Sequence, residues 1–269
     1  MRQLVKLIVI ILLATTLQVN AHSEYVEAAK LNSKKAGFDE GMLNPADAYE
    51  WLTKETELVN YPAQTLLALM FQYGIYVEKD TNLALSMLLE SASHQEAMAI
   101  CLLTDAFENG DLGLKADPDL AKWLSEKVNN HFTAFALLEL SDFYKDINDI
   151  ENEIKFLKKY LIKASVLSPS YTNEKMYRLG EFYYLGDDVN QDLNKAFELF
   201  KKAAESPIFP DKNAMKRLSK CYRFGYGTEN DIEKSDHLLQ LAVLRNNNIA
   251  YGTILYQFAN ITKWKKSSI

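Results

Sequence analysis

Residues that interrupt helices are scarce in this sequence. It contains only 10 glycines and 6 prolines, and no stretch of it has low complexity. Alanine, leucine, lysine and glutamate, which favour helices, are abundant instead. The composition therefore predicts a chain that is helical nearly throughout.

Cysteine and histidine are rarer still. The two cysteines, Cys101 and Cys221, are too few for a disulfide framework. They fall at similar places in repeats about three units apart, so we expect two separate thiols. None of the four histidines forms an H-E-x-x-H motif or another paired spacing, which argues against a metal site.

An excess of positive charge is also missing. The chain has 36 acidic and 30 basic residues, whereas a surface that binds nucleic acid is basic, so we expect no generic nucleic-acid binding. The sequence contains no C-x-x-C, no G-x-S-x-G and no phosphate-binding loop. It therefore predicts a protein that is not an enzyme, has no catalytic residues and carries no cofactor or metal.

The first 21 residues have the layout of a secretory signal. Arg2 and Lys6 precede an apolar run over Leu7–Ala14, and Val19-Asn20-Ala21 places small residues where a signal peptidase cuts. A membrane anchor is the alternative, but a spanning helix needs about 20 apolar residues and this run is shorter. We predict cleavage after Ala21, a periplasmic or secreted location, and no stable membrane insertion of the cleaved chain.

An internal repeat is the strongest pattern in the sequence. Gly74, Gly110, Gly186 and Gly225 are separated by 36, 76 and 39 residues, and the middle gap is twice 38, which predicts a hidden unit near Ile147. Small, apolar and aromatic residues recur eleven, seven, six and three positions before each landmark. The five sets are Ala63, Leu67, Ala68, Phe71; Ala99, Leu103, Thr104, Phe107; Ala136, Leu140, Ser141, Tyr144; Lys175, Leu179, Gly180, Tyr183; and Ala214, Leu218, Ser219, Tyr222.

This spacing places each set on one face of a helix. The small residues let another helix approach closely, and the aromatic residue fills the remaining gap. We therefore interpret the recurring aromatic residues as packing and not as a binding box. Ala250, Ile254 and Phe258 repeat the pattern against Ile261 and predict a further, partial unit.

A second helix follows each landmark. Its expected N-cap is an aspartate six or seven residues on, or Asn44 before the first full unit, and a small residue stands four positions after each cap. The caps are Asn44, Asp80, Asp117, Asp192 and Asp231, followed by Ala48, Ala84, Ala121, Ala196 and Ser235. The landmark glycines end the first helices, so each unit is an antiparallel helix pair, and the pairs must stack to bury their apolar faces. The third unit lacks its glycine, and its second helix is expected from about Ile150 to Val166.

Two of the units resemble the Sel-one-like repeat, a tetratricopeptide-type helix pair with a slightly longer loop. The matching residues are the run Leu179–Gly186, Val189, Asp192, Lys195-Ala196 and Lys202-Ala203-Ala204, and then Tyr222, Gly225-Tyr226-Gly227, Asp231 and Lys234. The resemblance covers about residues 44–261. It implies an all-α, right-handed superhelix of about five helix pairs with partial repeats at both ends, and adaptor or scaffold work on partner proteins.

We accordingly divide the chain into four parts. Residues 1–21 are the signal peptide, 22–43 an N-terminal segment that is partly helical or disordered, 44–261 the repeat superhelix, and 262–269 a basic tail. Some secreted members of the family are linked to β-lactam binding, but this sequence has neither S-x-x-K nor K-T-G.

Positions nine, five and two residues before each landmark point away from the packed face, because each residue turns the helix by about 100°. In related superhelices this side of the first helix lines the concave groove. The candidate partner-binding residues are Asp105, Glu108, Asp142, Tyr177, Glu181, Tyr184, Lys216, Lys220 and Arg223. They could bind a polar peptide or helix, or they could be ordinary solvated residues.

The sequence thus predicts an exported protein–protein interaction scaffold, such as a periplasmic regulator or assembly factor of an envelope complex. A secreted effector that binds proteins of a host or a neighbouring cell has the same sequence features. An enzyme that acts on cell-wall material or β-lactams is the third alternative.

Overall fold

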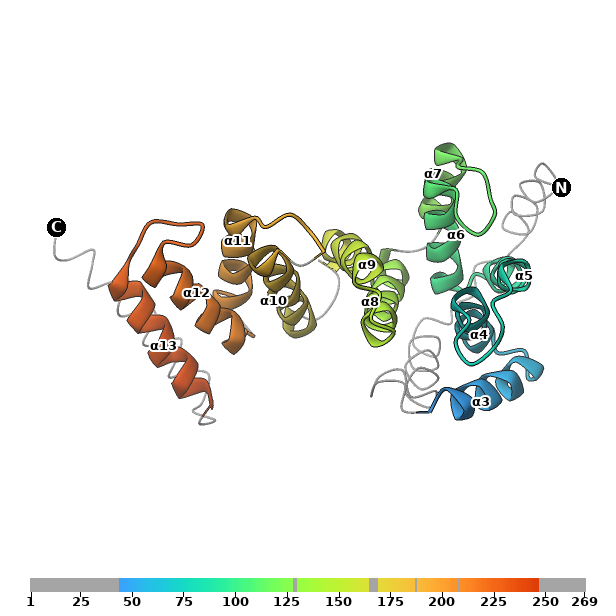
Figure 1. Cartoon of the computed structure of the whole chain (residues 1–269), viewed down its shortest axis with the longest axis horizontal. Coiled ribbons are helices and arrows are strands. Elements are labelled where there is room, and N and C mark those ends of the chain that lie inside the picture. Colours follow the sequence, from blue (N-terminus) through green and yellow to red (C-terminus); the bar gives the residue numbers. More distant parts are fainter. Residues whose placement is uncertain (1–43, 128–129, 165–168, 187, 208, 247–269) are drawn as a thin grey trace. The chain divides into compact units, whose positions relative to one another are not determined.

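The computed structural model describes residues 44–127, 130–164, 169–186, 188–207 and 209–246, and every regular element among them is a helix (Figure 1). The helices are α3 (Pro45–Glu57), α4 (Tyr61–Tyr73), α5 (Thr81–Ser93), α6 (Ala97–Asn109), α7 (Pro118–Lys127), α8 (Asn130–Asp146), α9 (Ile150–Lys163), α10 (Pro169–Leu185), α11 (Leu193–Ala204), α12 (Lys212–Phe224) and α13 (Ile232–Asn246). The predicted signal peptide, the segment 22–43, the partial repeat at Ala250–Ile261 and the tail 262–269 lie outside the described residues.

The described residues form two compact units, the first from residue 44 to residue 164 and the second from residue 169 to residue 246. In the first unit α4 packs on α5, α6 on α7, and α8 on α9; in the second α10 packs on α11 and α12 on α13. Neighbouring pairs also pack on each other, as α5 does on α6 and α11 on α12. The predicted all-helical class and its helix-pair repeat are confirmed.

Every predicted N-cap is made in the structure. Asp80, Asp117, Asp192 and Asp231 each accept a hydrogen bond from the backbone N–H three residues on, at 2.9–3.1 Å. Asn44 accepts one from the N–H two residues on, at 3.1 Å. Each cap satisfies a donor that the first helical turn leaves free, which stabilises the helix by about 1 kcal/mol.

The landmark glycines end the first helices of their units, as predicted. Gly74, Gly110, Gly186 and Gly225 have φ values of 68°, 81°, 78° and 73°, the left-handed conformation that a side chain disfavours. The third unit, which has no glycine, ends its first helix at Asp146 and places Asn148 at φ 57°. Asparagine is, after glycine, the residue that best tolerates this conformation, so the hidden unit also ends its helix with a left-handed residue, one position later than the other units do.

The small residues of the second helices lie in the core. Ala48, Ala84, Ala121, Ala196 and Ser235 are all at most 3% exposed, which lets the neighbouring helices approach. Among the recurring aromatic residues, three are buried and the other two are partly buried. The buried ones are Phe107, Tyr144 and Tyr222, and the partly buried ones are Phe71 and Tyr183. Their interpretation as packing residues is confirmed.

The third helix pair departs from the regular pattern. Its first helix, α8, packs on α6 of the preceding pair. Two lysines of its second helix, α9, form hydrogen bonds with α6. Helix α9 begins after the cap Asp149 and is described to Lys163, close to the predicted end at Val166. The spacing found this pair correctly, but it did not foresee where α9 lies.

Both cysteines are free thiols, as predicted. Burial raises the pKa of Cys101 to about 12 and that of Cys221 to about 11. The thiolate is the reactive form of cysteine, so these two side chains are held in their unreactive state.

Candidate protein-binding surface

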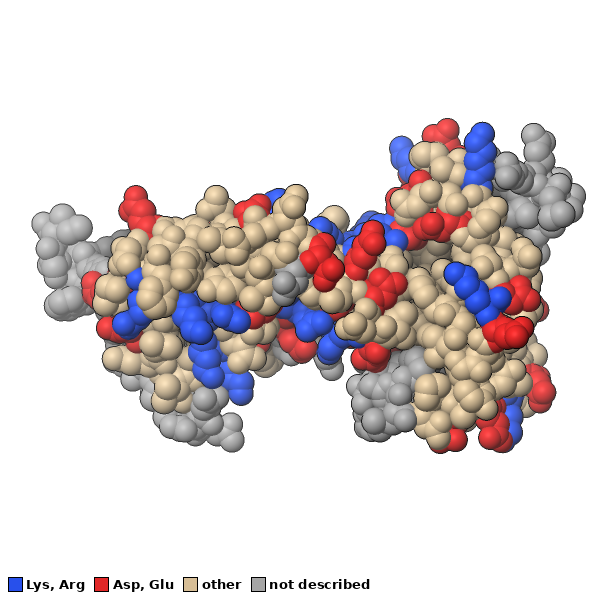
Figure 2. Space-filling view, viewed as in Figure 1, with Lys and Arg blue, Asp and Glu red and all other residues tan. Residues whose placement is uncertain are grey.

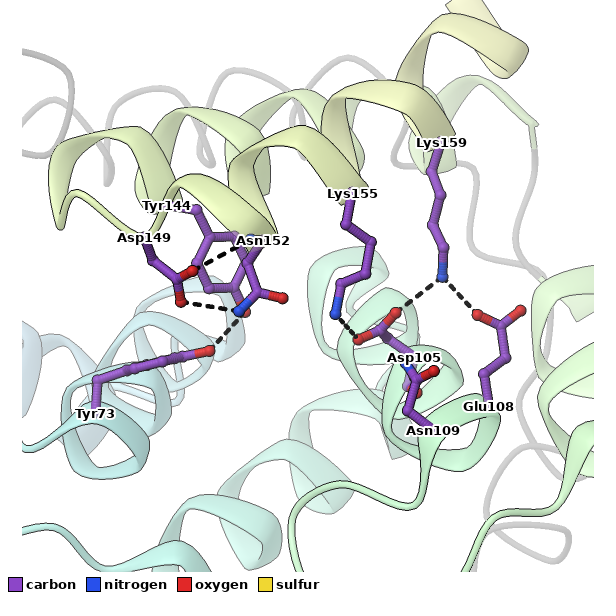
Figure 3. Close-up of polar contacts among 9 residues, drawn as sticks. All are labelled: Tyr73, Asp105, Glu108, Asn109, Tyr144, Asp149, Asn152, Lys155 and Lys159. Atoms are coloured by element: carbon purple, nitrogen blue, oxygen red, sulfur yellow. Dashed lines mark hydrogen bonds and ion pairs between the residues drawn. The ribbon is translucent and has the colours of Figure 1, made fainter. Parts of the chain in front are cut away.

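In the first unit, two of the predicted acidic residues bind lysines of the same chain (Figure 3). Asp105 of α6 receives hydrogen bonds from Lys155 at 2.7 Å and Lys159 at 2.9 Å, and Glu108 receives one from Lys159 at 2.6 Å. Asp105 is only 6% exposed. Both carboxylates hold α9 against α6; Asp105 is covered by the lysines, whereas Glu108 remains exposed.

The charge state of this cluster follows from its partners. Burial lowers the pKa of Lys159, but its hydrogen bonds to Glu108 and Asp105 outweigh that effect, so the pKa is raised. Lys159 therefore stays protonated between the two carboxylates. The third predicted acidic residue, Asp142 of α8, is half-buried in the same unit.

Beside this cluster lies a pair of tyrosines that links α4 to α8 (Figure 3). The hydroxyls of Tyr73 and Tyr144 are 3.2 Å apart, and the Tyr144 ring stacks on Phe156 at 5.1 Å between centroids. Burial raises the pKa of Tyr73 to about 12 and raises that of Tyr144 well above its ordinary value. The pair belongs to the packing of the first unit.

In the second unit, three predicted residues meet around an arginine that the sequence analysis did not single out. The guanidinium of Arg217 on α12 donates to Glu181 of α10 at 2.6 Å and lies 4.9 Å above the ring of Tyr184. The Tyr177 side chain also favours the charged form of this arginine. Burial lowers the pKa of Arg217, but the contacts with Glu181 and Tyr177 raise it more.

Aromatic side chains continue this cluster toward the surface. The ring of Tyr226 lies 5.8 Å from that of Tyr184 and 5.6 Å from that of Phe224. Phe224 is 59% exposed and Leu185, at the end of α10, is 52% exposed. We call Tyr177, Glu181, Tyr184, Arg217 and Tyr226 the Arg217 cluster. It combines tyrosine and arginine, the residue types that most often dominate binding energy at protein interfaces.

The remaining three predicted residues also lie on α12. Lys216 and Lys220 are exposed, whereas Arg223 pairs with Asp236 of α13 and donates to the hydroxyl of Ser235 at 3.3 Å. Figure 2 shows lysine and arginine side chains gathered on the second unit around α12. We name the exposed residues at intervals of four along this helix the α12 stripe: Lys212, Lys216, Lys220 and Phe224.

The structure therefore divides the nine candidates into three settings. Asp105, Glu108 and Asp142 belong to the first unit, where two of them pair with α9. The three residues on α10 form the Arg217 cluster with α12. Those on α12 itself are two exposed lysines and one arginine tied to α13.

Arg217 was missed because it stands eight residues before Gly225, one position from the predicted outward face. Phe224 and Tyr226 were missed as site residues because their exposure depends on how the loop after α12 packs. The only signal that pointed toward them was the basic and aromatic composition around Gly225.

Within the described ranges, no three His, Cys, Asp or Glu side chains come together as a group that could hold a metal ion. Among the same residues, none of the helices combines the length and the apolar character that crossing a membrane would require.

Tandem helix pairs with glycine-ended first helices and capped second helices define a helical-repeat protein. Four segments, residues 62–96, 97–127, 176–207 and 212–247, match the family model described as "Sel1 repeat". The chain belongs to the Sel1-repeat family. The irregular third pair is the part between the second and third matches.

Two solved structures are similar to this chain at low identity. A Sel1 repeat protein from Oxalobacter formigenes is 24% identical over 80% of this chain and 86% of that one, with a TM-score of 0.43. A protective antigen with an SLR fold, present in uropathogenic Escherichia coli strains, is 21% identical over 81% of this chain and 44% of that one, with a TM-score of 0.38. A search of curated proteins gave no match.

Sel1 repeats generally mediate protein–protein interactions, and proteins built from them are generally scaffolds without catalytic activity. This chain is a scaffold built from Sel1 repeats.

Proposed function

We propose that this protein is an exported interaction scaffold that acts in the periplasm as a regulator or assembly factor of an envelope complex. The observation that carries the proposal is the surface of the second unit formed by α10 and α12. There the Arg217 cluster holds aromatic side chains in place, and Phe224 and Leu185 extend from it into solvent.

Such a surface suits partner binding because its side chains are already ordered. Tyr184 contacts Arg217 on one side and the buried ring of Phe200, 6.2 Å away, on the other. Ordering a side chain at an interface costs about 0.5–1.5 kcal/mol, and this cost is reduced where the unbound protein already fixes the side chain. Exposed apolar groups beside an ordered aromatic cluster are typical of binding hot spots.

The proposed location rests on the first 21 residues, which have the charged start, apolar middle and small-residue end of a secretory signal. Fractionation of cells that produce the full chain tests it. We expect a processed protein that begins at His22 and is released with the periplasm. A processed protein found mainly in the culture medium would favour the secreted effector, and an unprocessed protein in the cytoplasm would contradict export.

The binding surface is tested by capture from an envelope extract on the immobilised, full-length processed protein. We expect the variant with Leu185→Ala and Phe224→Ala to lose the dominant protein that the wild type retains, with affinity lower by about tenfold or more. The matched control carries Leu58→Ala and Ile162→Ala, which remove apolar groups of the first unit that are even more exposed than Leu185 and Phe224.

The two variants are compared with the wild type by circular dichroism, because all four side chains are exposed and the helices should melt as before. Equal capture by the wild type and both variants would contradict the placement of the surface on α10 and α12. Failure of the wild type to retain any protein would contradict the scaffold itself.

A further inference from the structure

Helix α12 has an unusual charge for this protein. Its thirteen residues, Lys212–Phe224, include four lysine and arginine side chains beyond Lys212 itself and no aspartate or glutamate. The chain as a whole carries a formal net charge of −6. Positive charge is thus concentrated on one helix of an acidic protein.

The charges of α12 fall into two groups. Arg217 is paired with Glu181, and Arg223 is paired with Asp236. Lys212, Lys216 and Lys220 are exposed, and none of them has an ion-pair partner in the part of the chain that the structure describes.

Lysines elsewhere in the chain show that local pairing is readily achieved. Lys54 pairs with Glu50 one helical turn away, and Lys195 and Lys234 pair with the aspartate caps of their own helices. Among the residues that the structure describes, no lysine of the α12 stripe makes such a pair. Like charges four residues apart destabilise a helix, and a lysine in the first turn opposes the helix dipole.

Helix α12 nevertheless forms, because other interactions hold it. Asp211 caps its first turn by accepting from the N–H of Ala214 at 2.7 Å, and Gly225 ends it in the left-handed conformation. Ala214 and Leu218 are fully buried on its inner side. Repulsion between the exposed lysines therefore lowers the stability of the helix, and carboxylates of a bound partner would reduce this repulsion.

The stripe ends on an apolar group. Phe224 follows Lys220 at the same interval of four residues. Its ring lies beside that of Tyr226, with 5.6 Å between the two centroids. The twelve steps from Lys212 to Phe224 span roughly 18 Å at a rise of 1.5 Å per residue, the length of about three helical turns.

We propose that the α12 stripe docks an acidic segment of a partner protein, with carboxylates over the three lysines and an apolar side chain against Phe224. The inference rests on the proposed scaffold function and names the chemistry of its partner. Opposite charges align such a segment and speed its encounter, and the apolar end fixes its register. A partner segment that covers the whole stripe must be about as long as the stripe itself, roughly 18 Å.

A protein segment fits the stripe better than an anionic membrane does. A helix that lies on a membrane needs a broad apolar face beside its lysines. On α12 the apolar face is turned into the core of the second unit, and Phe224 is the single large apolar residue of the stripe.

The first experiment identifies what lies on the stripe. The full-length processed protein carries the photoreactive residue p-benzoylphenylalanine in place of Phe224, is irradiated in the native envelope extract, and the attached peptide is sequenced by mass spectrometry. A second protein carries the same group in place of Ile162, which is 79% exposed on α9. We expect attachment at position 224 to a peptide rich in aspartate and glutamate, and little at position 162.

The second experiment measures binding of that peptide, made synthetically with a fluorophore, to the purified protein by fluorescence anisotropy. Lys216→Glu should weaken binding by about tenfold, and added salt should weaken the wild-type complex. The carboxylate that this substitution introduces can pair with Lys212 and Lys220, one turn away on either side, so the melting temperature should not fall. Lys122→Glu, at an exposed lysine of α7, is the control for net charge and should bind as the wild type does.

Each other outcome overturns the inference. A neutral or basic peptide attached at position 224 would contradict the acidic partner but not the scaffold proposal. The same holds if the Lys216→Glu variant binds the peptide as tightly as the wild type does. A lipid adduct assigns the stripe to a membrane surface, and a peptide of this chain assigns it to a second copy. Protein attached at position 162 alone places the partner on the first unit, and no attached protein at either position contradicts the scaffold as well.

Discussion

At the residue scale, the tyrosine pair of the first unit shows how burial changes chemistry. Tyr144 was predicted as a packing residue from its place in the repeat, whereas Tyr73, one residue before Gly74, was not singled out. The structure places their hydroxyls 3.2 Å apart and largely away from water. A buried hydroxyl resists ionisation, because the charged form loses its hydration.

This burial predicts a loss of stability in alkali. The pKa of Tyr73 is about 12 in the folded chain and about 10 in the unfolded chain, so the folded chain keeps a proton that the unfolded chain releases. Its contribution is complete below pH 10 and is lost as the pH rises toward 12. We expect Tyr73→Phe to reduce the loss of unfolding free energy between pH 8 and pH 11 by about 1.4 kcal/mol.

The measurement is urea denaturation at both pH values, with tyrosine ionisation followed by absorbance at 295 nm. Tyr76→Phe, which changes an exposed side chain, is the matched control. An alkaline loss of the same size in the wild type and in Tyr73→Phe would refute the assignment.

A second prediction at this scale compares two acidic residues of α6, Asp105 and Glu108. Asp105→Ala leaves Lys155 and Lys159 without their shared buried partner and should destabilise the chain by about 1–2 kcal/mol. Glu108→Ala removes an exposed partner of Lys159 and should cost less than about 0.5 kcal/mol. Thermal melts of the two variants check the difference, and equal melting temperatures would mean that Asp105 is not buried beneath α9.

At the element scale, the contact between α10 and α11 depends on a missing side chain. Gly180 stands where the other units have alanine, threonine or serine, six residues before the landmark. A Cβ on Gly180 would lie 2.6 Å from an atom of the Phe200 ring, which is fully buried. The sequence predicted a small residue at this position, but only the packing shows that this unit has no room even for a methyl group.

Gly180→Ala should therefore destabilise the second unit, although alanine favours a helix. Alanine gains roughly 0.5–1 kcal/mol in helix propensity, whereas forcing the ring of Phe200 aside costs about 1–3 kcal/mol. We expect a net loss of about 1–2 kcal/mol in denaturant unfolding. In a Phe200→Leu background the same substitution should be neutral or stabilising, and a loss of equal size in both backgrounds would exclude this contact as the cause.

The third helix pair shows what the repeat pattern cannot foresee. The spacing located α8 and α9 without a glycine landmark, because buried positions keep their interval when a loop residue changes. The packing of the pair differs from the others, since α9 places Lys155 and Lys159 on the outward face of α6. Those contacts join residues 50 and 54 positions apart, which no local spacing records.

At the scale of the whole molecule, the chain consists of two units, each with its own helices. The second unit has a core in which Phe200, Met215, Leu218 and Leu241 are buried together. A unit that buries its own apolar surface is expected to fold without the rest of the chain.

We therefore expect the fragment 167–269 to be helical and to unfold cooperatively on its own. Circular dichroism at 222 nm during a thermal melt measures this. The fragment with Leu218→Ala, a fully buried side chain, should melt at a clearly lower temperature, since such substitutions cost about 2–5 kcal/mol. A fragment without helical signal would show that the second unit needs the first.

The sequence by itself determined the helix pairs, their caps, their glycine endings and their small contact residues. Each of these depends on neighbours within a few positions, so a fixed spacing is enough to reveal it. Only the tertiary structure decided which of the outward-pointing charged side chains stay exposed. Asp105 and Lys220 both stand five residues before the glycine of their unit, yet Asp105 is covered by lysines of a distant helix and Lys220 remains exposed. Helical periodicity gives the direction of a side chain, but what meets it there depends on how distant segments pack.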